Sequence, residues 1–258
     1  MRQPLAYVHP AAKIASNVVI DPFVTIDGNV EIGEGTRIMS NVTILDGARI
    51  GKNCIIFPGA VVSAIPQDLK FKGEDTVAIV GDNTTLRECV TVNRGTAAKG
   101  KTVVGSNCLI MAYTHIAHDC VIGDNVIISN ATQVAGEVQI DNYTVVGGGA
   151  LIHQFTHIGS HVMIQGGALV NKDIPPFVKV GRQPISYAGI NSVGLRRRNY
   201  TNDQIREIQE IYRYMYLSGL NNSDALERIE AELPASKERD EIIMFVRNAK
   251  RGILRGYM

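Results

Sequence analysis

The chain has 258 residues, with 26 Lys and Arg against 25 Asp and Glu, so its formal net charge is only +1. A balance this even excludes bulk electrostatic attraction to nucleic acid or to an anionic membrane surface. Hydrophobic residues make up 45% of the chain and charged residues 20%, a globular composition that excludes a mainly disordered protein.

The first residues, Met1 to Leu5, contain no apolar signal core, and no run of about 18 apolar residues follows anywhere in the chain. We therefore expect a cytoplasmic protein with no membrane insertion. Aromatic residues make up only 6%, Trp is absent and 25 residues are Gly. A core with so few large rings has to be filled by aliphatic side chains, which is typical of a repetitive fold.

A six-residue repeat extends from Val8 to Val170. Stepping by six along it reaches Ile, Val or Leu at 25 of 28 positions, and the exceptions are Asp68, Glu74 and Ala98. A small or β-branched residue usually lies four positions after each of these anchors, and Gly often follows the anchor directly. Such hexapeptides are typical of a parallel β-helix in which three of them form one triangular coil. Residues 18 apart then stack at about 4.8 Å, with the anchors inside.

Two segments, 63–79 and 93–103, break the repeat, which then returns in phase. We interpret them as loops that project from the prism, and long loops on a rigid scaffold often carry function. A proline pair ends the coil. The sequence thus predicts a β-helix domain over residues 1–186, and a linker with a helical domain over residues 187–258.

Three helices are expected in the C-terminal region. Thr201 and Gln204 form a capping box ahead of apolar residues at helical spacing. Ser223 is predicted to cap the second helix and Ser236 the third. Because about 60 residues of helix bury little surface alone, we expect them to pack on the prism or on a neighbouring subunit.

The four cysteines favour neither redox chemistry nor metal binding. Cys54, Cys108 and Cys120 occupy the small, inward register of the repeat, which predicts free buried thiols, whereas Cys89 lies outside it. No CxxC pair exists. The pattern therefore supports neither a disulfide framework nor a cysteine zinc site.

The coil period singles out one histidine. Gly136 lies one coil beyond His118 and Gln154 lies two coils beyond it, so the three are predicted to stack in a column with His153 beside it. A general base on one side of a reacting carbon and a backbone N–H on the other make a catalytic constellation. We expect the column to provide both.

Several motifs occur together and in order. They are Gln67-Asp68-Leu69-Lys70-Phe71, Asn93-Arg94-Gly95-Thr96, His115-Ile116-Ala117-His118-Asp119-Cys120, Ile152-His153-Gln154-Phe155 and Asn191-Ser192-Val193-Gly194-Leu195-Arg196-Arg197-Arg198. With them the chain resembles, almost end to end, the acyl-carrier-protein–UDP-N-acetylglucosamine O-acyltransferases, which begin lipid A synthesis in Gram-negative bacteria. The resemblance implies a left-handed coil and a homotrimer with its active sites in the clefts between prisms.

The resemblance also implies a reaction. An (R)-3-hydroxyacyl chain would pass from acyl carrier protein to the 3-hydroxyl of UDP-N-acetylglucosamine, with no cofactor, no metal and no acyl-enzyme. His118 would be the general base, Asp119 would assist its imidazole, and the Gly136 N–H would stabilise the oxyanion. Neighbouring residues on a strand point to opposite faces, so a contact between Asp119 and His118 requires a turn between them.

Further residues match substrate-binding positions of that family. They are Gln67, Asp68, Lys70, His115, His153, Gln154, Asn191, Arg197 and Arg198. The first three match the sugar end of the site, and Asn191 and Arg197 match the uridine nucleotide. Arg198 either joins these two or meets the acidic carrier protein. Gly166 matches the position that limits acyl length, and Gly there favours a long chain.

The chain departs from the family's pattern at three places. Glu137 follows Gly136 where the best-known members have His, Val193 stands where many have Glu, and Asn93 stands where many have His. The role of Gly136 is a backbone role and is unaffected. The altered rim leaves a 3-amino sugar acceptor open, with UDP-N-acetylglucosamine expected ahead of it.

Four other functions fit the sequence less well. The sister N-acyltransferase carries an extra N-terminal domain, whereas the repeat here begins at Val8. A zinc carbonic anhydrase on the same prism requires three converging His ligands. An acetyltransferase using coenzyme A shares the base but reads a pantetheine alone. A silent scaffold has no need of two polar loops and a stacked His–Gly–Gln column.

Overall fold

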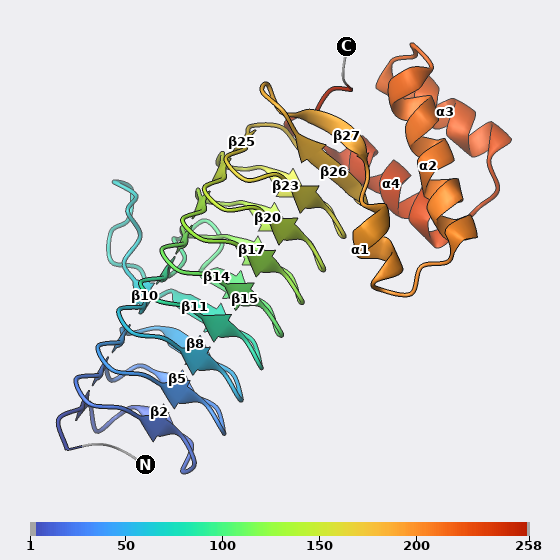
Figure 1. Ribbon diagram of the computed structural model, residues 1–258. Coiled ribbons are helices and arrows are strands. Elements are labelled where there is room, and N and C mark those ends of the chain that lie inside the picture. The colour runs from blue at the N-terminus through green and yellow to red at the C-terminus, as the bar shows by residue number, and fades with distance from the viewer. Residues whose placement is uncertain (1–3, 257–258) are drawn as a thin grey trace.

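The computed structural model describes residues 4–256 as a prism of stacked coils followed by a group of helices (Figure 1). Three sheets form the sides of the prism, and consecutive strands from β1 to β26 enter different sheets, so each regular coil contributes one strand to each side. This confirms the predicted β-helix with a helical C-terminal region. The outermost residues of the two predicted domains, 1–3 and 257–258, lie outside the described residues.

The strands are short, most of them two residues long. The first sheet holds β1 (Tyr7–Val8), β4 (Thr25–Ile26), β7 (Thr43–Ile44), β10 (Val61–Ala64), β13 (Thr91–Asn93), β16 (His115–Ile116), β19 (Gln133–Val134), β22 (Leu151–Ile152) and β25 (Leu169–Val170). The second holds β2 (Lys13–Ile14), β5 (Glu31–Ile32), β8 (Ala48–Ile50), β11 (Val77–Val80), β14 (Lys101–Val104), β17 (Val121–Ile122), β20 (Gln139–Ile140) and β23 (His157–Ile158). The third holds β3 (Val19–Ile20), β6 (Arg37–Ile38), β9 (Ile55–Ile56), β12 (Thr85–Leu86), β15 (Leu109–Ile110), β18 (Ile127–Ile128), β21 (Val145–Val146), β24 (Met163–Ile164), β26 (Val178–Gly181) and β27 (Ser186–Ile190).

The repeat anchors fill the interior of the prism. Each two-residue strand places its second residue inward, because successive strand residues face opposite sides of a sheet. Ile26, Ile44 and Ile116, for example, have no exposed surface. Almost all neighbouring strands pair in parallel, and the exception is the antiparallel pair of β26 and β27.

The two interruptions of the repeat are whole hexapeptides. Paired residues in regular coils are 18 apart, as in Ile116 with Val134. Val62 pairs with Val92, 30 residues on, and Val92 pairs with Ile116, 24 residues on, which is an excess of 12 and then of 6. An insertion of whole hexapeptides leaves the later anchors in phase. It also explains why the three exceptions to the repeat fall in these segments.

The small inward register holds the cysteines as predicted. Cys54, Cys108 and Cys120 are free and buried, and Cys89 is free and exposed. Burial raises the pKa of the Cys108 thiol to about 11 and that of Cys120 to about 12. These buried thiols therefore stay protonated near neutral pH and are not activated nucleophiles.

Four helices follow the prism: α1 (Ser192–Arg196), α2 (Asn202–Leu217), α3 (Asn222–Glu232) and α4 (Lys237–Asn248). The capping box of Thr201 and Gln204 is confirmed at the start of α2, and Ser236 caps α4 as predicted. The predicted cap at Ser223 is wrong. The side chain of Asn221 accepts the capping hydrogen bond instead, since Asn caps a helix as well as Ser does. The short helix α1 was not predicted.

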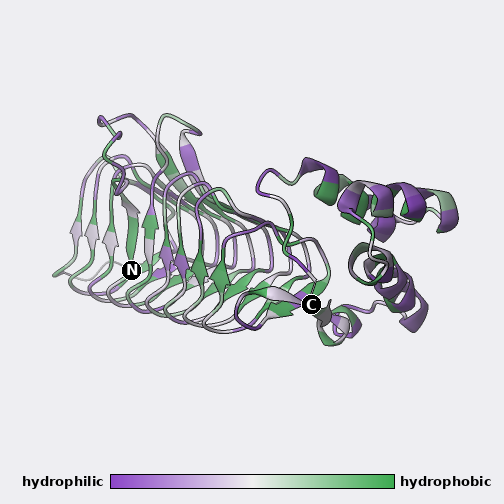
Figure 2. Cartoon of the chain, turned by 90° about the horizontal axis from the view of Figure 1, so that it is seen from above, coloured by the Kyte–Doolittle hydropathy of each residue, from purple (hydrophilic) through white to green (hydrophobic). Residues whose placement is uncertain are grey.

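The helices pack on the last coils of the prism, as expected, while their outer faces are mainly hydrophilic (Figure 2). Tyr212 of α2 is buried, and its hydroxyl donates to the carbonyl of Pro176 at 2.6 Å. From α4, Phe245 packs against the ring of His157 at 4.5 Å between centroids. The helical region is therefore anchored to the C-terminal end of the β-helix.

A buried histidine lies at this junction. His161 is 9% exposed, and its Nδ1 has no partner among residues 4–256. Its ring stacks on Tyr143 at 4.9 Å and on Phe177 at 5.5 Å. Burial, followed by the positive charges of Arg198 and Lys237, lowers the pKa of His161 to about 4.

Acidification should therefore destabilise the protein through His161. The unfolded imidazole takes up its proton near its usual pKa of about 6.5, whereas the folded one does so only near 4. Stability from the neutral ring is thus present above about pH 6.5 and falls by up to about 3 kcal/mol as the pH drops toward 4. Urea unfolding at pH 7.5 and pH 5 measures this loss, which should shrink in His161→Asn. An equal loss in both proteins would contradict the assignment.

Candidate active site

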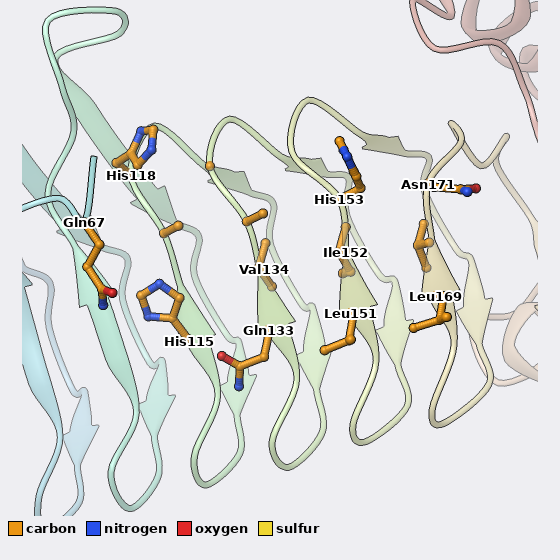
Figure 3. A pocket seen from close by; sticks show the side chains of 14 residues that line it. Gln67, His115, His118, Gln133, Val134, Leu151, Ile152, His153, Leu169 and Asn171 are labelled. Carbon is orange, nitrogen blue, oxygen red and sulfur yellow. The ribbon is translucent and has the colours of Figure 1, made fainter. Parts of the chain in front are cut away.

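A groove of about 530 Å³ runs along the first sheet, across β16, β19, β22 and β25 (Figure 3). Its lining residues come from these strands, from the turns that follow them and from the first projecting loop. They are Gln67, His115, Ala117, His118, Gln133, Val134, Ala135, Gly136, Leu151, Ile152, His153, Leu169, Val170 and Asn171. The groove therefore contains one end of the column predicted from the sequence.

The groove gains apolar side chains along its length, and His153 and Asn171 line its far part beside them. Gln67, His115 and His118 line one end, and Leu151 and Leu169 lie toward the other (Figure 3). Both leucines are about half exposed, at 49% and 56%. A groove with this gradient suits a ligand that has a polar head and an apolar chain.

The outward residues that form the floor of the groove were not predicted from the sequence. Gln133, Leu151 and Leu169 pair in register above His115, each one coil further on. The signal that reveals them is the same 18-residue step that links His118 to Gly136. The same step from His115 reaches Gln133, Leu151 and Leu169 in turn.

His118 and Asp119 are in direct contact. The Nδ1 atom of His118 lies 2.8 Å from Oδ2 of Asp119, which has no exposed surface. The turn that this contact requires is present, because Asp119 has a left-handed backbone with φ of 60°. Nε2 of His118 faces the groove and lies 3.9 Å from Oδ2 of Asp68. The arrangement provides an imidazole with one nitrogen anchored and the other available.

Gly136 lies directly beside that available nitrogen. A Cβ atom placed on Gly136 would be only 2.6 Å from Nε2 of His118. The amides on either side are engaged, since Ala135 N–H donates to the backbone carbonyl of Ile152 and Glu137 N–H donates to the backbone carbonyl of His118. Among residues 4–256 the Gly136 N–H has no acceptor, although the residue is buried. A backbone donor without a partner next to a base is available for a ligand oxygen.

The other two predicted histidines also line the groove. Nδ1 of His115 lies 2.7 Å from the Thr91 hydroxyl. Burial, with the nearby His118 as a second cause, lowers the pKa of His115, so its neutral form is favoured. His153 is exposed, and its Nδ1 lies 3.0 Å from the backbone oxygen of Gln154. The side chain of Gln154 is not part of the lining.

The first projecting loop brings two of its three predicted residues to the site. Gln67 lines the groove, and Asp68 approaches His118 as described. Oδ1 of Asp68 also accepts from the backbone N–H of Lys70 at 2.9 Å, which fixes the loop locally. The side chain of Lys70 is exposed and does not line the groove.

The remaining predicted residues lie outside the groove of their own chain. Asn191 caps α1, and its amide donates to the carbonyl of His161 at 2.9 Å. Arg197 is exposed, and the guanidinium of Arg198 lies 4.4 Å from the centre of the Tyr143 ring. Gly166 is exposed at a corner of the prism. The predicted contacts of these four residues with nucleotide and acyl chain stay predictions.

Within residues 4–256, no three His, Cys, Asp or Glu side chains form a group suited to hold a metal ion. Over the same residues, none of the helices combines the length and the apolar character that a bilayer-crossing segment needs.

Comparison with known families gives matches along the chain. A profile described as UDP-N-acetylglucosamine O-acyltransferase, domain 2, matches residues 173–254. A profile of bacterial transferase hexapeptides matches residues 101–136, and one of the GMPPB C-terminal domain matches residues 2–107.

Individual relatives carry the same description as the profile that matches residues 173–254. An acyl-[acyl-carrier-protein]–UDP-N-acetylglucosamine O-acyltransferase from Trichlorobacter lovleyi is 50% identical over 255 residues, covering 97% of this chain and 98% of that protein. One from Chlorobium phaeobacteroides is 59% identical over 194 residues, 75% of this chain and 74% of that protein. The crystal structure of a UDP-N-acetylglucosamine acyltransferase from Bacteroides fragilis superposes with a TM-score of 0.98 at 56% identity, covering 99% of this chain and all of that one.

Proposed function

The chain belongs to the family of acyl-[acyl-carrier-protein]–UDP-N-acetylglucosamine O-acyltransferases, and we propose that it transfers an (R)-3-hydroxyacyl chain from acyl carrier protein to the 3-hydroxyl of UDP-N-acetylglucosamine. This reaction is the first step of lipid A biosynthesis. The cytoplasmic location expected from the sequence is part of the proposal.

One observation carries this function. His118, Asp119 and the free amide of Gly136 meet at the polar end of a groove whose other end is lined by Leu151 and Leu169. A sugar hydroxyl belongs at the first end, and a long acyl chain gains binding energy by burying its methylenes at the second. The reacting carbonyl then lies between the base and the amide.

In the proposed mechanism, Nε2 of His118 removes the proton from the sugar 3-hydroxyl as its oxygen attacks the thioester carbonyl. The Gly136 N–H donates to the oxyanion of the tetrahedral intermediate. The carboxylate of Asp119 stabilises the imidazolium at Nδ1. The intermediate then expels the carrier thiolate, which takes the proton from Nε2 and restores the neutral base. No acyl-enzyme forms, since the thioester is already activated.

A homotrimer with its sites between prisms is also proposed. The groove is open along one side, and its apolar residues Leu151 and Leu169 remain half exposed in one chain. Asn191, Arg197 and Arg198 do not line it in the same chain. A neighbouring copy that covers the groove would bury the leucines and bring its own set of these three residues to the nucleotide.

The proposal is tested with a ladder of (R)-3-hydroxyacyl carrier proteins. With UDP-N-acetylglucosamine, kcat/KM should peak at one long chain and fall about fourfold for each methylene removed, since each buried CH₂ contributes about 0.8 kcal/mol. Gly166→Met should move the peak to a shorter chain if Gly166 limits the acyl length. Acyl-coenzyme A donors and the 3-amino sugar nucleotide serve as controls. Turnover only with either of them would contradict the proposed donor or acceptor.

A further inference from the structure

The second inserted segment, 93–103, lies against the base of the site. It adds one hexapeptide to its coil, and its turn places Thr96 beside Asp119. The Thr96 N–H donates to Oδ1 of Asp119 at 3.0 Å, and the Thr96 hydroxyl lies 2.6 Å from Oδ2. Thr96 is 8% exposed and does not line the groove, so these contacts are made out of reach of substrate.

The direction of the Thr96 hydroxyl proton is fixed by its neighbours. The backbone N–H of Ala98 donates to Oγ1 of Thr96 at 3.1 Å, which uses the oxygen as an acceptor. The single hydroxyl proton is then directed at the carboxylate. Hydrogen bonds to an ionised acceptor are short and strong, and 2.6 Å lies in the range for an O–H donor to a carboxylate.

The carboxylate of Asp119 accordingly receives donors on both oxygens. Oδ1 accepts from the Thr96 amide, and Oδ2 accepts from the Thr96 hydroxyl and faces Nδ1 of His118. Thr96 thus donates to both oxygens of the carboxylate. The carboxylate acts as an acceptor toward Nδ1 of His118 as well, which favours the tautomer in which Nδ1 carries the proton. Nε2 is then unprotonated, which is the state that a base needs.

The same segment also holds the backbone of Asp119. The Asp119 N–H donates to the buried hydroxyl of Thr102 at 2.8 Å, and Nζ of Lys99 donates to the Asp119 carbonyl at 3.2 Å. These contacts support the left-handed turn that points the carboxylate back at the imidazole. Side chains and backbone of 93–103 thus surround Asp119 on the side away from the groove.

We propose that Thr96 is a positioning residue for the His118 base, acting through the carboxylate of Asp119. Its catalytic consequence rests on the proposed acyltransferase function, whereas its effect on the titration of His118 does not. The inserted hexapeptide has a role in this view: it supplies the donors that orient and hold the carboxylate behind the base.

Removing the hydroxyl has a defined direction of effect. In Thr96→Val, Oδ2 of Asp119 loses one donor and its negative charge is less compensated, so it stabilises the imidazolium of His118 more strongly. Protonation of the ring is then favoured, which moves the acid limb of the pH–rate profile to higher pH. Asp68, His115, Lys99 and the buried thiol of Cys120 are ionisable groups near this pair, and the substitution leaves them in place.

The test compares Thr96→Val, Thr96→Ser and Thr84→Val with the wild type in the full-length protein. In Thr96→Val, kcat should fall about tenfold, a typical effect of losing a contact behind a functional side chain. KM for the sugar nucleotide should be unchanged, and the acid limb of the kcat/KM profile should move to higher pH. Thr96→Ser keeps the hydroxyl and should match the wild type in kcat, KM and pH profile.

Thr84→Val is the matched control, since it removes a buried threonine hydroxyl that donates to the carbonyl of Gly105 at 2.7 Å, away from the groove. It should leave kcat and the pH profile unchanged. NMR titration of the His118 ring reports the pKa without turnover. An unshifted ring in a folded Thr96→Val protein would overturn the inference. An inactive wild type that still shows the shift would contradict the proposed function alone.

Discussion

His118→Ala should lower kcat/KM about 10³-fold, because general-base catalysis by a positioned imidazole contributes about 10²–10⁴-fold. The loss equals about 4 kcal/mol of transition-state stabilisation. The loss should appear in kcat, because the base accepts the proton in the transition state and the groove that binds the substrates is unchanged. Initial rates with the preferred long-chain acyl carrier protein and UDP-N-acetylglucosamine measure the effect.

His157→Ala is the matched control for this variant. His157 also pairs with an aspartate at 2.8 Å, that of Asp141, but it packs beside Phe245 and does not line the groove. If the loss of any His–Asp pair in the prism lowered the activity by destabilising the protein, the two variants would lose similar activity. We expect His157→Ala to keep most of the activity. Undiminished turnover in His118→Ala would leave the family membership standing and contradict the mechanism.

The prism itself was predictable because its signal is repeated. An anchor every six residues is tested 28 times along the chain, and the three failures turn out to lie in inserted hexapeptides. The column of His118 and Gly136 follows from the same period and the fixed spacing of coils. Regular structure allowed long-range neighbours to be inferred from sequence distance alone.

The contacts behind the base were not predictable in this way. Thr96 lies 23 residues before Asp119, a separation that matches no multiple of the coil because the segment between them contains the insertion. The contact of Asp119 with His118 depends on a left-handed φ at a residue that is not glycine. The left-handed φ at Asp119 recurs at six-residue spacing, as at Tyr113 and Asn125, so the repeat contains that turn, whereas the contact with Thr96 depends on the geometry of the inserted segment.

The C-terminal region shows a further limit. The cap of α3 is Asn221 and not Ser223, because both residue types cap helices and a sequence with several in a row leaves the choice open. The nucleotide contact of Asn191 stays a prediction, and what the sequence did not show is that its side chain caps α1 and donates to the carbonyl of His161. Its structural contacts were visible only once His161 was placed at the junction.

Gly136→Ala should reduce kcat about 10²-fold or more without unfolding the protein. Gly136 has no left-handed backbone, so alanine fits its conformation. The added methyl, however, would lie 2.6 Å from Nε2 and 2.7 Å from Cε1 of His118. The imidazole must move, and it then loses its place beside the reacting carbonyl. Loss of a positioned general base typically costs about 10²–10⁴ in rate.

A double-mutant cycle separates the two causes of that loss. In the His118→Ala background the ring is absent, so the three nearest atoms that the methyl of Ala at position 136 would meet are gone. If displacement of the imidazole dominates, Gly136→Ala should then cost almost nothing beyond the loss already caused by His118→Ala. A full additional loss in the double variant would show that the methyl disturbs the oxyanion donor itself. Equal activity of Gly136→Ala and wild type would contradict the placement of both groups around one reacting carbon.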